Sequence, residues 1–499
     1  KMNLLVMSLV SAAALSFTSC SSNDDLAGNA GQEKVNGFYM TLNVQTPKSD
    51  GTRTAVKDYT TEGATPAESD VTSGTIYLVD AKNNVVFKKV ITASEWKAGK
   101  PTQGNNGSTQ IKIAVEKVVA GATYKVYFLA NVGDENLWKD TFTATDIFTA
   151  NNKFAKPYDT DNNFAMFNQN DGEVNGNDYT VVFTDENKNA TTAAKIKYNN
   201  EVKPIKIERL TARIDEPTSN ATKIVAYTGS NATEAEKRAM KDAVDKVESI
   251  KMTGYAISNL SNKSYIMQNW TETTLNIPSD ITYYQPTKKF GTATLLENGD
   301  YFTAPTPAPT TPAPTTPNTH KDYVFENNSS TAATSMYFEY TVKLKDMTDA
   351  DFSDGTFYRY NNVIYKSFAD IYKHYKDVAG LFDGKTKEEM KNLVIAAKAA
   401  PTATDTKTVE EKLDEFRKTY KIEVFNCGKT YYKQAIKDQH LTYENAIQRN
   451  SIYRLTVNNI FNVGAQVPNG TPDKEGLFYL DVTVSVNPWV LNTQDVDLK

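Results

Sequence analysis

The sequence is poor in cysteine, histidine and arginine, and it has no excess of positive charge. Its 499 residues include two cysteines, Cys20 and Cys427, and the first of them lies in a targeting segment. A framework of disulfides within the mature chain is therefore excluded. The 55 basic residues are mixed with 60 acidic ones, which gives a net charge of −5. No basic face is expected, so nucleic acid is excluded as a partner.

Recognised catalytic signatures are also missing. The histidines at positions 320, 374 and 440 are not spaced like the metal ligands of H-E-x-x-H, and we expect each on the surface. No G-x-S-x-G motif, P-loop or dinucleotide-binding glycine pattern occurs. Cys427 has no histidine close to it in the sequence, so we interpret it as a buried thiol rather than a nucleophile. We therefore expect no enzyme, no cofactor and no metal site.

What the chain does contain is enough apolar and aromatic material for large cores. It is 39% hydrophobic and 23% charged, which is typical of two or three globular domains at this length. The 28 tyrosines and 22 phenylalanines, with abundant threonine and valine, favour strands over helices. We predict a mainly β fold.

The N-terminus has the pattern of an export signal. An apolar run of about 14 residues starts at Leu4, which suits a signal peptide better than a membrane span. The run ends in Phe17-Thr-Ser-Cys20, which is similar to a bacterial lipobox although Phe17 replaces the usual leucine. We predict that residues 1–20 are a lipoprotein signal peptide and that Cys20 is lipidated.

An amphipathic strand and a linker follow the signal. Phe38, Met40, Leu42 and Val44 alternate with polar residues, which is the period of a half-buried strand. The next residues, 47–70, are rich in turn formers and contain Arg53, the only arginine before Arg209. Arg53 is either a solvated loop charge or a single flexible site for an arginine-specific protease.

Short strands separated by polar loops make up the next part of the chain. The pattern predicts a hairpin over 74–91 and strands over 111–118, 123–131, 179–183 and 205–214. Such spacing is typical of a β-sandwich. A domain boundary is expected near residue 215, although a strand over 208–214 would also suit the start of the second domain.

Helices interrupt the strands in the second half. Thr233 and Glu236 stand in the register of a capping box at the start of a helix that should end near Glu248. Three more helices are predicted within 367–420, as insertions on a β scaffold whose strands cover 250–257, 264–270, 336–345, 422–432 and 451–460. The proline-rich stretch 304–319 is expected to be an extended loop.

The C-terminus has two apolar sets in series. Val482, Val484 and Val486 alternate with polar residues in one strand, which Pro488 is expected to end or bend. The second set is Trp489, Val490, Leu491, Val496 and Leu498. It is either an edge strand folded back on its own sheet or a strand donated to a neighbouring molecule.

Several of these segments together resemble one family. They are Gly74-TIYLVDAKNNVV, Tyr124-KVYFLAN, Glu208-RLTAR, Arg449-NSIYRLTV and Val482-TVSVNPWVLNTQDVDL, in this order after a lipobox, a strand and a single arginine. The set is similar to the Bacteroidales fimbrillins, and within them to the shaft subunits of the short, or minor, fimbriae (type V pili). The proline-rich loop and the helical insertions depart from that pattern.

The resemblance implies a fold and a route to the cell surface. It implies two transthyretin-like β-sandwich domains, 54–215 and 216–499, of which the second carries the helical insertions. Residues 21–53 would be a propeptide with a removable strand, cut off by an arginine-specific protease between Arg53 and Thr54. The precursor would travel through the outer membrane as a palmitate-bearing lipoprotein.

The same resemblance implies a structural function. Trp489 to Leu498 would be a donor strand that joins subunits head to tail into a fimbria, with accessory fimbrial subunits and an anchor as further partners. Host or bacterial surface receptors would be bound in adhesion, colonisation and virulence. Two alternatives stay open, an accessory or tip adhesin of the same fimbria and a surface glycan-binding lipoprotein or glycosidase. An adhesin would need no donor strand, and the glycan-binding protein would need no cut at Arg53.

Overall fold

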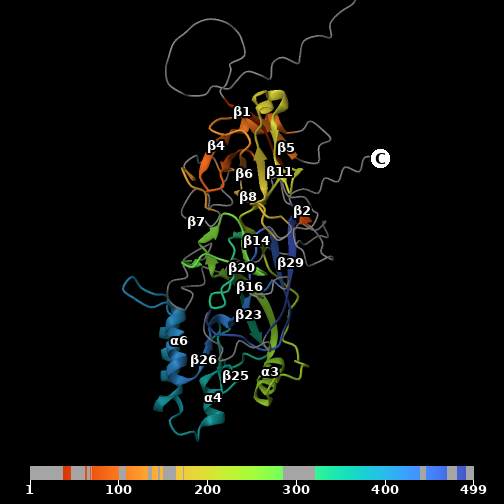
Figure 1. Ribbon diagram of the computed structural model, residues 1–499. Helices are drawn as coiled ribbons and strands as arrows, with labels where there is room; N and C mark the ends of the chain where they lie inside the picture. The colour runs from red at the N-terminus through yellow and green to blue at the C-terminus, as the bar shows by residue number, and fades with distance from the viewer. Residues whose placement is uncertain are drawn as a thin grey trace, which may run out of the picture. The chain divides into compact units, whose positions relative to one another are not determined.

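The computed structural model describes residues 37–45, 62–63, 68, 70–100, 108–132, 137–143, 147–149, 164–171, 174–281, 283–284, 321–438, 446–468 and 480–490. These residues contain 29 strands and five α-helices (Figure 1). The prediction of a mainly β fold is confirmed.

The first sheet contains eleven strands. Its main path runs β10-β1-β13-β8-β6-β9-β11-β12, while β3 joins β6 to β4 and β5 pairs with β1. The strands are β1 (Phe38–Gln45), β3 (Gly74–Val79), β4 (Val85–Ile91), β5 (Ser108–Val115), β6 (Thr123–Ala130), β8 (Met166–Asn168), β9 (Tyr179–Val182), β10 (Ala194–Lys195), β11 (Lys197–Tyr198), β12 (Glu201–Val202) and β13 (Ile205–Arg209). The hairpin predicted over 74–91 is confirmed, as are the strands predicted near 111, 123 and 179.

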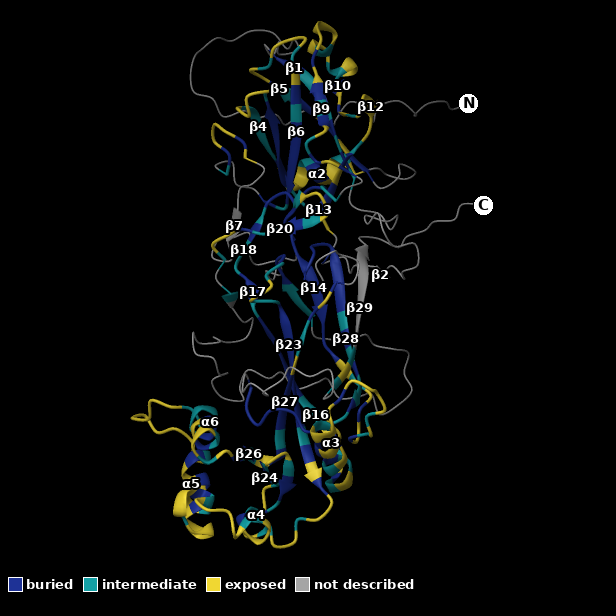
Figure 2. Ribbon diagram, turned by 60° about the horizontal axis from the view of Figure 1, so that its bottom comes forward, coloured by how far each residue is buried: buried dark blue, intermediate teal, exposed yellow. Residues whose placement is uncertain are grey.

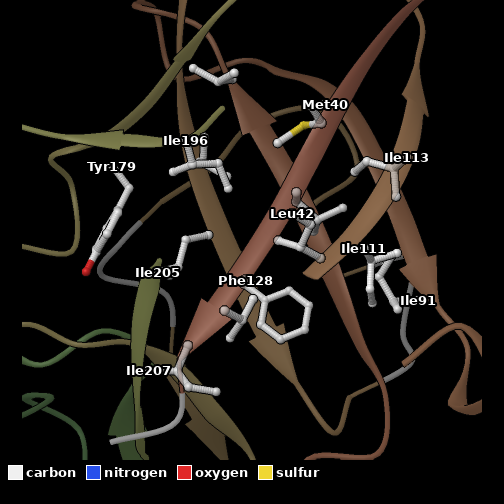
Figure 3. Packing of buried hydrophobic residues seen from close by; sticks show 14 of the residues in the cluster. Met40, Leu42, Ile91, Ile111, Ile113, Phe128, Tyr179, Ile196, Ile205 and Ile207 are labelled. Carbon is white, nitrogen blue, oxygen red and sulfur yellow. The ribbon is translucent and has the colours of Figure 1, made fainter. Parts of the chain in front are cut away.

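Buried side chains from the strands of this sheet form one hydrophobic core. Buried side chains from β1 and β5 join those from β3, β6, β9 and β13 in a single cluster (Figure 3). Trp96, on helix α2 (Ala93–Gly99), stacks on Phe128 of β6 with ring centroids 5.5 Å apart. The alternation of apolar residues along each strand places one row of side chains in this core, as the sequence predicts.

The segment predicted as one strand over 205–214 forms two strands, because the chain changes sheet in the middle of it. β13 ends at Arg209 and pairs with β8, whereas β14 (Ala212–Asp215) pairs with β22 and β28 in a second sheet. The buried Arg209 side chain lies at the switch and donates from Nη1 to Asn450 Oδ1 at 2.8 Å. The apolar positions shift phase here, from Ile205 and Ile207 to Leu210, Ala212 and Ile214, so the pattern holds a local sign of the change that the prediction of one strand overlooked.

The second sheet runs β2-β29-β28-β14-β22, and β15 pairs with β28. Its strands are β2 (Glu62–Gly63), β14, β15 (Thr218–Ser219), β22 (Lys321–Val324), β28 (Ser451–Ile460) and β29 (Leu480–Val490). Two three-stranded sheets follow, one of β16 (Val247–Ser258), β23 (Ser335–Leu344) and β27 (Lys429–Ala435), the other of β24 (Phe357–Tyr360), β25 (Val363–Tyr365) and β26 (Glu423–Phe425). Three strand pairs are β17 (Leu260–Ser261) with β21 (Tyr283–Tyr284), β18 (Lys263–Tyr265) with β7 (Ile147–Thr149), and β19 (Asn269–Thr271) with β20 (Thr274–Asn276).

A second core lies between the strands of these sheets. It gathers buried side chains of β14 and β28 with those of β16, β23 and β27. Apart from Ile452, the first core draws on residues up to Ile207 and the second on residues from Ala212 onward. The core therefore changes where the chain changes sheet, while the division into domains 54–215 and 216–499 stays a prediction.

The helices begin where capping boxes were predicted. Helix α3 (Glu234–Lys246) starts at Thr233, and α5 (Lys387–Lys398) and α6 (Val409–Tyr420) start at Thr386 and Thr408, each with both reciprocal hydrogen bonds of the box. Helix α4 (Phe368–Tyr375) completes the insertion, whose own apolar cluster packs on β24 to β26. Figure 2 shows many exposed residues on these helices, whereas β14 and β23 are mostly buried.

The prediction of a buried thiol at Cys427 is wrong. Cys427 is exposed and lies in a 3₁₀ turn (Asn426–Gly428) that splits the strand predicted over 422–432 into β26 and β27. Its φ is +52°, in the left-handed region, and its amide donates to Thr356 Oγ1 at 2.9 Å. His374 is exposed, as predicted, and the other two histidines are outside the described residues.

Arg449, just before β28, carries a buried charge. Its side chain is fully buried, Nη2 donates to Glu326 Oε2 at 2.8 Å, and Nη1 donates to the carbonyl of Ile266 at 2.9 Å. Glu326 is also buried, so each charge depends on the other for compensation.

We predict that Arg449→Met lowers the free energy of unfolding by about 3–5 kcal/mol, because it leaves the Glu326 carboxylate buried without its cation. Urea denaturation measures this change. Arg238→Met, at an exposed site on α3, is the matched control and should change stability by less than about 0.5 kcal/mol. Equal effects of the two substitutions would contradict the assignment.

Candidate functional site

The described part of the chain offers no candidate metal site and no candidate membrane-spanning helix. Among these residues no group of three or more histidine, cysteine, aspartate or glutamate side chains could hold a metal ion. None of the described helices is both long enough and apolar enough to span a membrane. The candidate site is therefore built from the two strands that the sequence singles out, one near each end of the chain.

β1 is the amphipathic strand predicted over Phe38 to Val44, and its existence is confirmed. Met40, Leu42 and Val44 are buried, and Phe38 is 9% exposed, while the residues between them are half-buried. This alternation follows from the period of two along a strand. One whole row of β1 side chains therefore belongs to the first core.

Both edges of β1 have partners. All eight of its residues pair antiparallel with β5, from Phe38 opposite Val115 to Gln45 opposite Ser108. On the other edge it runs parallel to β10 and then to β13, where Val44 lies opposite Ile205. Among the described strands, β5 pairs with β1 alone. Removal of β1 would therefore open a slot between β5 on one side and β10 and β13 on the other.

The buried row of β1 packs against large apolar side chains of the first core. Figure 3 shows Met40 and Leu42 among Ile111, Ile113 and other buried residues of the first core. At the start of the strand, the ring of Phe38 lies 5.5 Å from that of Phe183. A fully buried large apolar side chain contributes about 1.5–3 kcal/mol. The row is therefore a major part of what holds this core together.

β29 is the strand near the other end of the chain. It pairs antiparallel with β28 from Leu480 opposite Ile460 to Pro488 opposite Ser451, with one irregularity near Val457. β29 continues through Pro488 to Val490, so the strand does not end there as one form of the prediction had it, although its pairing with β28 stops at Pro488. Proline lacks only one ladder donor, and a strand near the edge of a sheet tolerates that loss.

The outer edge of β29 is covered at its end by β2. Glu62 lies opposite Trp489, and Gly63 lies opposite Val490, in a parallel pairing. Sequence reasoning missed this contact, because a two-residue strand inside a turn-rich linker has no pattern of its own. Trp489 and Val490 thus form the last described residues of a paired strand.

The other residues predicted for the site are outside the described part of the chain. They are Cys20, Arg53, Thr54, Leu491, Val496 and Leu498. Lipidation, the cut and strand donation accordingly stay predictions.

Comparison with known proteins connects the C-terminal strands to one family. Residues 423–495, which include β26 to β29, match the family model described as major fimbrial subunit protein type IV, fimbrillin, C-terminal. This match confirms the resemblance to fimbrillins for that part of the chain. No curated protein matches the chain.

Several solved bacterial structures resemble the chain. A candidate cell adhesion protein from Parabacteroides distasonis has 13% identity and a TM-score of 0.47, over 92% of this chain and 99% of that one. A fimbrilin from Porphyromonas gingivalis has 14% identity and a TM-score of 0.42, over 91% and 99% of the two chains. A fimbrial assembly protein from Parabacteroides distasonis has 12% identity and a TM-score of 0.30, over 60% and 81%.

We predict that Leu42→Ala lowers the free energy of unfolding by about 2–5 kcal/mol, because it opens a cavity under β1. Thr41→Ala, on the half-buried face of the same strand, is the matched control and should cost less than about 1 kcal/mol. Urea denaturation of both variants measures the difference. A Leu42 variant as stable as the parent chain would show that β1 contributes nothing to this core.

Proposed function

We propose that the chain is a structural subunit of a cell-surface fimbria. The observation that carries the proposal is the match of residues 423–495 to the C-terminal part of a major fimbrial subunit. The matched residues include strands β26 to β29, which lie in the sheets around the second core and in the sheet under the helical insertion. The main partner would be a second copy of the chain, with accessory fimbrial subunits and an anchor at the ends of the filament.

Subunits would join by strand exchange. Loss of β1 would expose the slot between β5 and β13, and an open slot of this kind templates the addition of a strand from another molecule. Within the segment Trp489 to Leu498, the part beyond β29 supplies Leu491, Val496 and Leu498 for that purpose. Donation from the C-terminus of one subunit to the N-terminal sheet of the next is a head-to-tail contact, which extends without closing.

The same arrangement would keep the precursor monomeric during export. While β1 fills the slot, both of its edges are paired, so this slot is closed to a strand from a second copy. Cys20 would carry the lipid through the outer membrane, and a cut between Arg53 and Thr54 would release β1 at the cell surface. The filament would then support adhesion and colonisation through receptors on host or bacterial cells.

Arg53→Ala tests the cut. We predict that this variant is exported and retains β1, and that it forms no filaments because its slot stays filled. N-terminal sequencing of protein taken from cells, together with electron microscopy of the cell surface, measures both effects. Arg238→Ala, at an exposed arginine on a helix, should leave processing and assembly unchanged. Filaments whose subunits still contain Phe38 to Val44 would refute the proposal.

Deletion of residues 491–499 tests donation. These nine residues span about 30 Å when extended at about 3.3 Å each, which is long enough to line the slot. β29 ends at Val490, so the shortened chain keeps the described strand intact. We predict an unchanged melting temperature of the monomer and loss of polymerisation, measured by calorimetry and by sedimentation.

A substitution series provides the matched control for that deletion. Serine at Leu491, Val496 and Leu498 removes apolar side chains and should weaken assembly, while serine at Asn492, Thr493 and Gln494 should not. If the deletion unfolds the monomer, the segment is an internal strand. If deleted chains polymerise normally, donation by this segment is wrong.

A further inference from the structure

Glu68 is a buried acid in the stretch that follows the Arg53 linker. Glu68 is 2% exposed, and one oxygen of its carboxylate, Oε1, accepts three hydrogen bonds. The donors are Arg213 Nη1 at 3.0 Å, Lys321 Nζ at 3.0 Å and the Tyr323 hydroxyl at 2.7 Å. Arg213 lies on β14 and the other two on β22, so a single side chain ties the segment to two neighbouring strands.

The main chain of Glu68 is held as well. Its carbonyl oxygen accepts from Arg209 Nε at 2.8 Å, at the point where the chain changes sheet. The network continues outward, because Arg213 also donates to Asp215, which accepts from Arg454 Nε of β28 at 2.7 Å. Residue 68 is thus fixed at both its carboxylate and its backbone.

The charges of this network need Glu68. Arg209 is fully buried, and burial lowers the pKa of its guanidinium to about 9, while the negative charge of Glu68 acts in the opposite direction. Removing the carboxylate would leave Arg213 with less compensation in a region of low dielectric. The cations would then favour water over the protein interior, and the contact would open.

Glu68 lies only five residues after the end of β2. Glu68 lies fifteen residues after Arg53, and β2 lies between them. β2 covers the outer edge of β29 at Trp489 and Val490. A two-residue pairing is too short to persist unaided, because it fixes many backbone dihedrals for few hydrogen bonds. Some additional contact must therefore hold β2 in place, and Glu68 is the closest fixed point described along the chain.

We propose that the buried Glu68 carboxylate is an anchor that keeps β2 on the end of β29, and that it does so after β1 has been cut away. Residues 491–498 would then leave the subunit from a fixed point rather than from a frayed strand end. The contact between Glu68 and its cationic cradle rests on the structure alone, while its consequence for donation rests on the proposed function.

Hydrogen exchange of the full-length chain tests the anchor directly. Glu68→Gln keeps the shape of the side chain and removes its charge. We expect exchange at Glu62, Gly63, Trp489 and Val490 to rise by about tenfold or more, since a buried partner of several donors is weakened. Exchange in β28 should stay unchanged. No rise at β2 and the end of β29 would overturn the proposal.

Glu339→Gln is the matched control. Glu339 is also buried, and its Oε2 accepts from Lys429 Nζ at 3.0 Å and from the Tyr431 hydroxyl at 3.3 Å, in the sheet of β23 and β27. This variant should raise exchange in that sheet and not at β2. An equal rise at β2 in both variants would show a general loss of stability and would also overturn the anchor.

Tyr323→Phe covers the case in which Glu68→Gln does not fold. It removes one of the three donors and leaves both cations, so a smaller rise at the same amides is expected, and its absence counts against the proposal. Filament yield gives a separate readout, and we expect Glu68→Gln to lower it while release of β1 proceeds normally. Filaments formed by Arg53→Ala chains would refute the proposed strand donation. They would not affect the hydrogen-exchange test of the Glu68 anchor.

Discussion

The pairing of β1 on both of its edges is the constraint on which the first half of the molecule depends. Its eight residues pair with β5 along their whole length, and the opposite edge meets β10 and β13. Buried backbone donors and acceptors must be satisfied, so this position cannot stay empty once the core around it has formed. Whatever occupies it must be extended and must present apolar residues at every second position.

Local patterns in the sequence predicted most of the individual elements. The alternation in Phe38 to Val44 predicts β1, and the pairs of threonine and glutamate predict the starts of three helices, because both signals depend on neighbouring residues only. The apolar positions shift phase between Ile207 and Leu210, but the change of sheet itself is not determined by neighbouring residues. It depends on pairing with β8 and then with β22, strands that are distant in the sequence.

The candidate site was predictable in part for the same reason. The strand character of β1 and β29 was evident, but their partners and the two-residue strand β2 were not. The strand does not end at Pro488 because a missing N–H group ends a strand only where the sheet needs that donor. Cys427 was misread because the positive φ of its turn, which brings the residue to the surface, is not encoded by an apolar pattern.

The described contacts of β1 and those of β2 lie largely in different sheets. Every pairing of β1 lies in the first sheet, whereas the pairing of β2 and the side-chain hydrogen bonds of Glu68 lie with β14, β22 and β29 of the second. One strand connects the two sets, because β13 pairs with β1 and its last residue, Arg209, donates to the Glu68 carbonyl. Removal of β1 after a cut between Gln45 and Glu62 would take a strand from the first sheet, but no described hydrogen bond of the second sheet would be lost with it. Such a cleavage would open a slot beside β5 and leave the bonds of β2 and Glu68 to the second sheet in place.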